Sequence, residues 1–394
     1  MGERTVENPI KVSVVIPVYN GGLAFAKCLD DLIHQTLQEI EIICVNDGST
    51  DKETLEILER YERWDKRVKV FHQENQGAGA ARNHGLSKAV GKYLSFLDAD
   101  DFFEPDMLEK AYLAAEAQQA DISIFRGDRY DDDKREFLPM AYSIKKEMLP
   151  ASNPFNYKDV KEHVFTFIVG WAWDKLYLRE FVIRENLQFQ NTRTSNDLLF
   201  VFSSMVKAKS IYTMDDLLIH HRINLKDSLS VTREKSWNCF FVAGRALYEE
   251  LVRMGIYEEV KRAYLSWMLH FSFWNLDSIV GPSFEKVYQL LKDEVFPFME
   301  LTSYERTYFQ HPKLYDRAME ILETNAHEYL LAEIVPKRAA EQQLKEANAE
   351  IKKLKVELAK QKEKYAEIKK SRCYRIGKIV LYLPWKFKQI FKKA

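Results

Sequence analysis

Short apolar runs alternate with amphipathic stretches through the first 125 residues of the chain. The runs have the length of buried strands, and the stretches between them repeat with the period of helices. We predict strands over residues 12–16, 41–45, 68–71, 93–97 and 122–125, and helices over residues 25–35, 52–64, 79–89 and 105–119. This alternation predicts an α/β fold built around a doubly wound sheet.

Two acidic clusters follow two of these predicted strands. Asp47 follows the second strand, and Asp98, Asp100 and Asp101 follow the fourth. Ligands of open parallel sheets bind beyond the carboxyl ends of the strands. Three carboxylates within four residues repel one another unless a cation neutralises them, which favours a hard divalent metal that also holds a phosphate. The alternative is that both clusters are ordinary turns, because Asp often satisfies the backbone of a turn.

Four motifs occur in one order along the first half of the chain: VSVVIPVYNGG, VNDGSTD, NQGAGAARNHG and FLDADD. Together they resemble family 2 glycosyltransferases with the GT-A fold, over roughly the first 230 residues. The resemblance implies an inverting enzyme that moves a sugar from a UDP-sugar donor to a hydroxyl of a glycan or lipid-linked acceptor. In this family such transfers build bacterial surface polysaccharides.

The resemblance assigns the base of the nucleotide to the first two motifs. It places Pro17, Val18, Tyr19 and Asn20 around the base. Asp47 is expected to accept a hydrogen bond from the uracil imide, a contact that would select uridine.

The resemblance assigns the diphosphate to the other two motifs. Arg82 is expected on the base and diphosphate side; the alternative is an ion pair on a helix surface. Asp100, the second acid of the DxD motif, is expected to bind Mn²⁺ or Mg²⁺, and Asp98 to face the ribose or the metal through water. The cation would act as a Lewis acid on the leaving group. Asp101 is expected to cap the next helix or to support the metal ligands.

A later motif, TSNDLLF at residues 194–200, resembles the family's ED-type motif with Asn196 in place of the usual Glu. The resemblance makes Asp197 the general base that takes the acceptor proton. Asp197 could also be the N-cap of a helix that begins at Leu198, and both roles can coexist. One base opposite a metal-bound leaving group implies a single displacement with inversion at the anomeric carbon.

Further residues have two interpretations. Arg222, in a segment that resembles a late family motif, could clamp phosphate, and His221 could complete the metal shell, although histidine pairs are often structural. Lys175 is a similar candidate. Residues 171–177 are predicted to be an aromatic core or a wall of the acceptor site, and residues 128–154 a loop over or beside the site.

Two other classes of protein share parts of this pattern. A nucleotide-binding oxidoreductase would show GxGxxG after the first strand, and a P-loop NTPase would show GxxxxGK[ST]; neither motif is present. A catalytically silent membrane scaffold is the third interpretation. The intact Asp98, Asp100 and Asp197 argue against the scaffold, and turnover of UDP-sugar would separate the two.

The C-terminal part of the chain has a different pattern. Residues 231–336 have helical periodicity with an aromatic stripe that we interpret as a buried face. Residues 337–370 carry a heptad with apolar residues at seven of eight seam positions, which predicts a coiled coil and a possible homodimer. The alternative is a lone amphipathic helix. The seam positions are Leu344, Ala347, Ile351, Leu354, Leu358, Gln361, Tyr365 and Ile368.

Charge is distributed unevenly along the chain. The net charge is −1 overall, but residues 337–394 hold 18 basic and 6 acidic residues. The last segment, residues 371–394, has seven basic residues and none that is acidic, and it has an apolar face that includes Ile376 and Phe391. Such a helix lies in the headgroup region of anionic membranes; nucleic acid is the rival partner, which the aromatic and aliphatic side chains disfavour.

Location and domain organisation follow from these patterns. No window approaches the ~18–20 apolar residues that span a bilayer, no leader is recognisable, and four scattered cysteines indicate a reducing compartment. We therefore expect a cytoplasmic protein, peripheral on the inner face of the membrane. The predicted domains are a GT-A domain (1–230), a helical subdomain (231–336), a coiled coil (337–370) and a membrane-associating tail (371–394).

Overall fold

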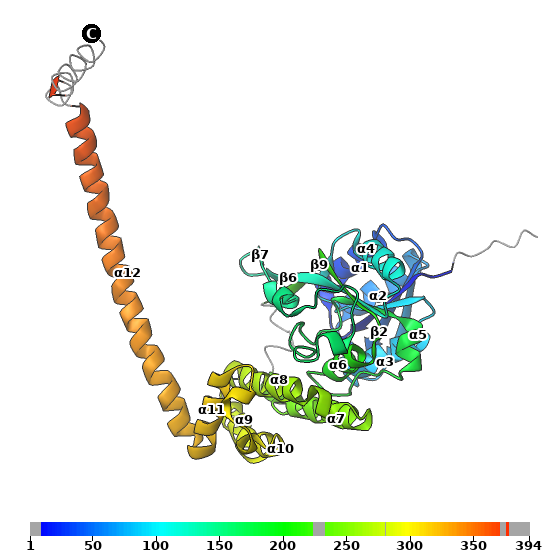
Figure 1. Cartoon of the computed structure of the whole chain (residues 1–394). Helices are drawn as coiled ribbons and strands as arrows, with labels where there is room; N and C mark the ends of the chain where they lie inside the picture. Colours follow the sequence, from blue (N-terminus) through cyan, green and yellow to red (C-terminus); the bar gives the residue numbers. More distant parts are fainter. Residues whose placement is uncertain (1–8, 224–232, 280, 371–375, 378–394) are drawn as a thin grey trace, which may run out of the picture. The chain divides into compact units, whose positions relative to one another are not determined.

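The computed structural model describes residues 9–223, 233–279, 281–370 and 376–377 (Figure 1). The described chain up to Glu323 forms one compact unit, and the residues from Thr324 onward form a second.

A mixed β-sheet forms the centre of the first unit (Figure 1). Within the described ranges its nine strands run in the order β3-β2-β1-β4-β8-β6-β9-β5, with β7 paired to β6. The strands are β1 (Val12–Val18), β2 (Ile40–Asp47), β3 (Val68–Gln73), β4 (Tyr93–Phe96), β5 (Phe102–Phe103), β6 (Ile122–Asp131), β7 (Glu136–Leu138), β8 (Lys175–Leu178) and β9 (Ile211–Ile223).

Strand direction divides the sheet into two halves. β1 to β4 are parallel, so their carboxyl ends lie at one edge. β8 is antiparallel to both β4 and β6, whereas β6 and β9 are parallel. The predicted alternation is confirmed for the first half, and the second half continues the same sheet with mixed directions.

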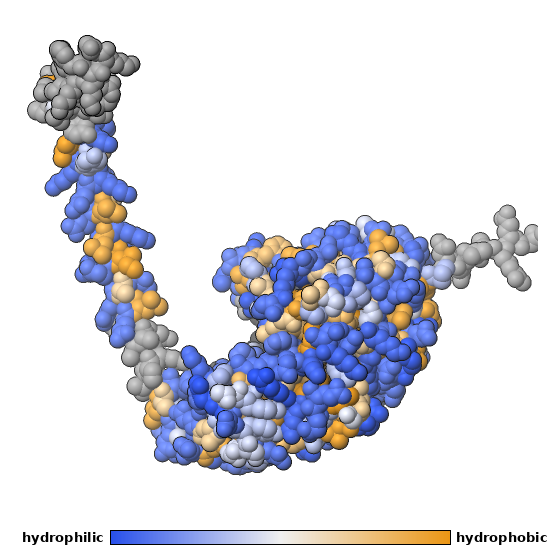
Figure 2. Space-filling view, in the orientation of Figure 1, coloured by the Kyte–Doolittle hydropathy of each residue, from blue (hydrophilic) through white to orange (hydrophobic). Residues whose placement is uncertain are grey.

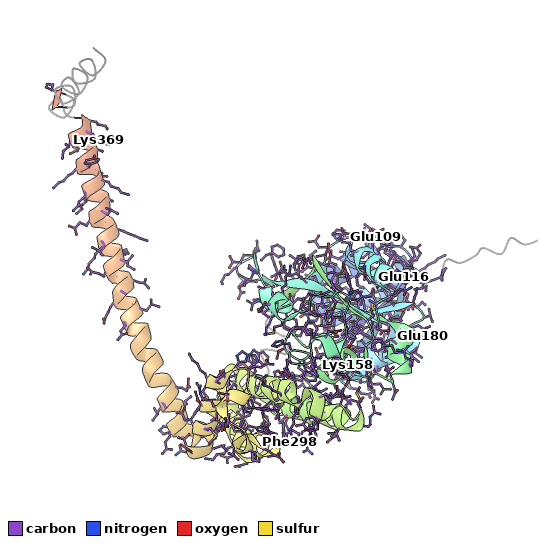
Figure 3. The ribbon with its side chains drawn as sticks, in the orientation of Figure 1. Glu109, Glu116, Lys158, Glu180, Phe298 and Lys369 are labelled. Atoms are coloured by element: carbon purple, nitrogen blue, oxygen red, sulfur yellow. The ribbon has the colours of Figure 1, made fainter. Side chains whose placement is uncertain are left out.

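Helices cover both faces of the sheet. α1 (Gly22–Ile33), α2 (Lys52–Trp64) and α4 (Met107–Gln118) share one hydrophobic core with alternate residues of β1, such as Val12 and Val14. Glu109 and Glu116 project from α4 (Figure 3). On the other face, α3 (Ala78–Lys88) packs closely on Val15 because Gly85 has no Cβ. α6 (Leu198–Lys207) lies on this face too, and α5 (Arg179–Arg184) follows β8.

Several element boundaries follow from local chemistry. α2 has the predicted bounds, because Asp51 at its N-cap accepts a 2.7 Å hydrogen bond from the Thr54 amide. The predicted loop at 128–154 is wrong at its start. β6 continues to Asp131 because it pairs with β9 on one side and β7 on the other. The rest of that segment contains short 3₁₀ turns: η1 (Ala141–Ser143), η2 (Lys146–Met148) and, beyond it, η3 (Tyr157–Asp159).

A helical region completes the first unit. Its aromatic stripe is buried as predicted at Phe240, Trp267 and Phe273, whereas Trp274 is 45% exposed. α7 packs on both α6 and α8, so this region is continuous with the sheet domain. The elements are η4 (Arg233–Ser236), α7 (Cys239–Arg253), α8 (Tyr257–Ser278), α9 (Ser283–Leu290), the π-helical η5 (Leu291–Val295), α10 (Phe296–Phe298), η6 (Leu301–Ser303), η7 (Arg306–Tyr308) and α11 (Pro312–Glu323).

The second unit consists mainly of one long helix, α12 (Ala326–Lys370). The helix continues through Pro336, so the boundary predicted at 336/337 falls inside a single element. Apolar side chains lie along it among hydrophilic ones (Figure 2), and Leu344 is 63% exposed. Apart from residues 376–377, the predicted membrane tail lies outside the described residues. No helix in the described ranges is long and apolar enough to cross a bilayer.

Candidate active site

Arg82 joins two parts of the chain that are far apart in the sequence. Its Nη2 donates a 2.5 Å hydrogen bond to Asp98 Oδ1, and its Nη1 donates a 2.7 Å hydrogen bond to Asn196 Oδ1. The guanidinium also lies 5.4 Å from the centre of the Phe189 ring. Arg82 is only 6% exposed, so the alternative of a helix-surface ion pair is wrong. The DxD segment and the Asn196-Asp197 segment therefore meet at one buried cation.

Asp197 occupies the N-cap position of α6, but its side chain makes no capping hydrogen bond. The carboxylate is thus not used to satisfy the helix end. Burial raises the pKa of Asp197 to about 6; Arg82 opposes the rise and Asp98 adds to it. A carboxylate with a pKa near 6 is ionised at neutral pH and is more basic than an ordinary Asp.

Asp100 lies on the turn after β4 and is half-buried. Burial and the negative charges of Asp101 and Asp98 raise the pKa of Asp100 to about 7. Within the described ranges, no hydrogen bond or ion pair engages its carboxylate, whereas one oxygen of Asp98 is held by Arg82. Asp100 is therefore the carboxylate of this cluster that is available to a ligand.

Asp101 has a different role from its neighbours. It is buried, and its Oδ1 accepts a hydrogen bond from the Arg222 amide at 3.0 Å and lies 2.9 Å from His221 Nδ1. The predicted cap of the following helix is wrong, because Asp106 occupies the N-cap position of α4. Burial raises the pKa of Asp101, and His221 opposes the rise. Burial lowers the pKa of His221, but Asp101 outweighs it and the net result is a pKa of about 9.

His221 ends a stack of aromatic rings beside the acidic cluster. Its ring lies 5.5 Å from that of Trp173 at an interplanar angle of 13°, and Trp173 lies 4.7 Å from Trp171 at 17°. Trp173 is buried, whereas Trp171 is half-buried. Residues 171–177 were predicted to be either an aromatic core or a wall of the acceptor site. Trp173 belongs to the core, whereas Trp171 reaches the surface next to the acidic cluster.

A divalent cation fits these residues if the substrate supplies part of its coordination shell. No group of three or more Asp, Glu, His or Cys side chains in the described ranges converges closely enough to hold a metal alone. Mn²⁺ and Mg²⁺ at phosphate sites often use one or two carboxylates together with the phosphates. The free carboxylate of Asp100 suits that arrangement. The His221–Asp101 pair also has the form in which a metal-binding histidine is oriented by a carboxylate.

The expected base site lies at the ends of β1 and β2. Asn20 bridges to the next turn: its Oδ1 accepts a 2.8 Å hydrogen bond from the Thr50 amide. Tyr19 is 52% exposed and Pro17 is half-buried, whereas Val18 is fully buried and does not reach the surface.

Asp47 holds the loop between β3 and α3. Its oxygens accept hydrogen bonds of 2.8 Å from the Gly77 amide, the Gln76 amide and the Gln73 side chain. Asp47 is 3% exposed. The predicted contact with uracil would therefore have to use the lone pairs that these three donors leave.

Arg222 and Lys175, which the sequence suggested as ligand-binding cations, each form an ion pair with a carboxylate of the chain. The Arg222 guanidinium donates to Asp132 Oδ1 at 3.0 and 3.2 Å, so a phosphate would have to compete with this ion pair. Lys175 is completely buried, and its Nζ donates to Asp174 Oδ1 at 2.5 Å and to the Trp171 carbonyl at 2.6 Å. The suggested ligand role for Lys175 is wrong; it is a structural residue.

The sequence did not indicate what Asn196 and Phe189 do. Both contact Arg82 from more than 100 positions along the chain. The unusual Asn in an ED-type motif was the one available signal, and it did not identify the partner.

Comparisons with known proteins identify the family of this chain. The family model described as "Glycosyl transferase family 2" matches residues 13–176. The cholesterol galactosyltransferase of Borreliella burgdorferi is 30% identical over 312 residues, which is 72% of this chain and 83% of that protein. The chain belongs to glycosyl transferase family 2. The uncharacterized glycosyltransferase EpsJ of Bacillus subtilis is 34% identical over 54% of this chain and 61% of its own length.

Solved structures support the fold of the first unit. Residues 1–349 of TarS from S. aureus, crystallised with UDP-GlcNAc, superpose with a TM-score of 0.51 at 20% identity. The match covers 79% of this chain and 90% of the TarS chain. This likeness identifies a GT-A-like α/β domain followed by helices.

Proposed function

We propose that this family 2 enzyme transfers a sugar, with inversion, from a UDP-sugar to a hydroxyl of a glycan or lipid-linked acceptor. One observation carries the proposal. The Asp197 carboxylate, with a pKa of about 6, has no capping role and lies within electrostatic reach of Arg82 and Asp98. Buried Arg82 bonds to Asn196, next to the proposed base, and to Asp98 of the proposed diphosphate-binding segment, which supports placing the two segments in one site.

In the proposed reaction, Asp197 accepts the proton of the acceptor hydroxyl as its oxygen attacks the anomeric carbon. The bond to the departing UDP breaks on the opposite side, so one displacement inverts the configuration. Arg82 orients Asp98 and Asn196 and keeps positive charge beside the site. Together these residues bring the acceptor, the base and the leaving group into one geometry.

Asp100, with Asp98, would hold Mn²⁺ or Mg²⁺ together with the donor phosphates, and His221 would join them only on losing the proton that its pKa of about 9 keeps on it at neutral pH. The cation supplies Lewis-acid stabilisation of the diphosphate as negative charge develops on it. Asp101 would orient His221 through the Nδ1 contact at 2.9 Å.

The donor in this proposal is a uridine nucleotide. The position of Asp47 at the carboxyl end of β2 supports it, as does the fold shared with TarS, which was crystallised with UDP-GlcNAc. The relative named poly(ribitol-phosphate) beta-glucosyltransferase supports an acceptor in surface polysaccharide synthesis, and the relative named cholesterol galactosyltransferase supports a lipid acceptor.

We further propose that α12 pairs with a second copy of the chain. Six apolar seam residues are between 48% and 63% exposed in the isolated helix, and they recur with heptad spacing: Leu344, Ile351, Leu354, Leu358, Tyr365 and Ile368. A second α12 is a partner that carries the matching seam. The basic tail would then bind an anionic membrane, where a lipid-linked acceptor is presented.

Purified protein should be assayed against a panel of UDP-sugars for release of UDP with and without Mn²⁺. The proposal predicts metal-dependent release for at least one member. GDP-sugars serve as the control, and a preference for them would contradict the uridine assignment. Absence of turnover with every sugar nucleotide would favour the scaffold interpretation.

A further inference from the structure

Arg129 on β6 is a cation for which the described residues provide no anionic partner. Within these ranges its side chain donates no hydrogen bond and forms no ion pair, and its Nε is buried without a partner. Its guanidinium carbon lies 5.9 Å from the centre of the Tyr142 ring. By contrast, Arg222 on the adjacent strand is paired with Asp132, and Arg82 with Asp98. A half-buried arginine is costly to leave unpaired, so this position is suited to an anion from outside the chain.

Arg129 lies on the same face of the sheet as the acidic cluster. β6 and β9 are parallel, with Arg129 directly beside His221 in the register. Neighbours in register point to the same side of a sheet, and His221 contacts Asp101 on that side. Gly127, two residues before Arg129 and therefore on the same face, lies against Trp173.

Aromatic rings connect Arg129 to this cluster. The Tyr142 ring lies 6.3 Å from the ring of Trp171, which stacks on Trp173 and thereby reaches His221. Tyr142 is 40% exposed and Trp171 is half-buried, so both offer ring surface to a ligand. The apolar face of a sugar ring packs well on such surfaces.

We infer that Trp171, Tyr142 and Arg129 form an acceptor platform that binds a sugar ring carrying an anionic substituent, a phosphate or a carboxylate. This inference rests on the proposed function. Most residues expected to bind the donor come from the β1–β4 half of the sheet, although His221 and Arg222 lie on β9, next to β6 and Arg129. The ring surface of Trp171 and Tyr142 assigns the platform to the acceptor sugar, and the effect of Arg129→Ala on UDP affinity tests this assignment against the donor side. Arg129 pairs with the anion, and Trp171 supports the ring.

The test measures binding to the full chain with saturating UDP and Mn²⁺. Three probes are titrated by calorimetry: methyl β-D-glucoside, methyl β-D-glucuronide and glucose 6-phosphate. A charge-assisted hydrogen bond predicts that at least one anionic probe binds about ten- to a hundredfold more tightly than the neutral glucoside. Preference for the glucuronide identifies a carboxylate, and preference for the sugar phosphate identifies a phosphate.

Arg129→Ala should abolish the preference for the anionic probe and leave UDP affinity unchanged. Arg126→Ala is the matched control: Arg126 also has a buried Nε without a partner, but it lies on the opposite face of β6. The control should keep the preference. Trp171→Ala should weaken the binding of all three probes, and Trp171→Phe should restore it. An unchanged affinity for UDP shows that each variant is folded.

Equal affinity of the three probes, no binding of any probe, or a preference that survives Arg129→Ala would overturn the inference. Loss of UDP affinity in Arg129→Ala would also overturn it, because that result assigns Arg129 to the donor. The proposed function fails separately, if the wild type releases no UDP from any UDP-sugar. If the wild type releases UDP from a UDP-sugar but shows no preference for an anionic probe, only the acceptor platform is contradicted.

Discussion

The amide oxygen of Asn196 accepts a 2.7 Å hydrogen bond from Arg82, whose other terminal nitrogen lies 2.5 Å from Asp98. Asn196 stands where family 2 motifs usually carry Glu. An amide satisfies Arg82 without adding a second negative charge next to Asp197. The ion pair of Arg82 with Asp98 therefore stays neutral overall beside the Asp197 carboxylate.

Asn196→Glu tests this electrostatic arrangement. The wild-type kcat/KM should fall as the pH drops through about 6, because protonation of Asp197 removes the base. A Glu at position 196 would compete with Asp98 for Arg82 and add one negative charge next to Asp197, and this added charge raises the pKa of Asp197. The acidic limb of the pH profile should move up by about one unit or more. Asn196→Gln, which stays neutral, is the control; an unmoved limb in Asn196→Glu would contradict the account.

Asp100→Ala tests the metal assignment. The variant should lose turnover, because the departing diphosphate would no longer be held with its cation. Asp133→Ala removes an exposed carboxylate from the β6–β7 hairpin and should keep full activity. UDP release is measured with Mn²⁺, with Mg²⁺ and after EDTA treatment. Undiminished activity of the metal-stripped wild type would show that the assignment is wrong.

Much of the fold was predictable because its signals are local. The alternation of the first 125 residues predicted the parallel half of the sheet, and Asp51 marked the start of α2. The extension of β6 was missed because its charged sequence, ending at Asp131, resembles a loop. The residues become a strand by pairing with β9 and β7, which lie elsewhere in the sequence.

The candidate site was predictable as a set of residue types but not as a set of contacts. Asp197 and the DxD acids were expected from their motifs. The contact between Asp101 and His221 was not expected, because the two residues lie 120 positions apart in the sequence. The burial of Lys175 could not be predicted either. The sequence places Asp174 next to it but does not show that the Asp174 carboxylate and backbone carbonyls enclose its ammonium group.

Ile351→Ser combined with Leu358→Ser tests the proposed pairing of α12. Both residues lie on the seam and are about half exposed in the single helix (48% and 52%). Polar seam residues should dissociate the dimer, because the seam loses its apolar contacts. Sedimentation equilibrium measures the mass. Val356→Ser changes a similarly exposed residue outside the seam and should leave the dimer intact. A monomeric wild type would contradict the pairing.

Deletion of residues 371–394 tests the membrane proposal. The segment carries seven basic residues, each worth ~1 kcal/mol near an anionic surface. The truncated protein should no longer sediment with anionic liposomes, while activity on a soluble acceptor is retained. Neutral liposomes provide the control for non-specific binding. If the truncated chain still sediments with the anionic liposomes, another segment is the anchor.

The most direct test of the account is the kinetics of Asp197→Asn. The substitution keeps the size of the side chain and removes its basicity. Acceptor-dependent kcat should fall by about 10²–10⁴, the usual contribution of a general base, while UDP-sugar affinity stays within a factor of about two of the wild type. An unchanged kcat, or a loss of donor affinity as large as the loss of rate, would contradict the assignment of Asp197 as the base.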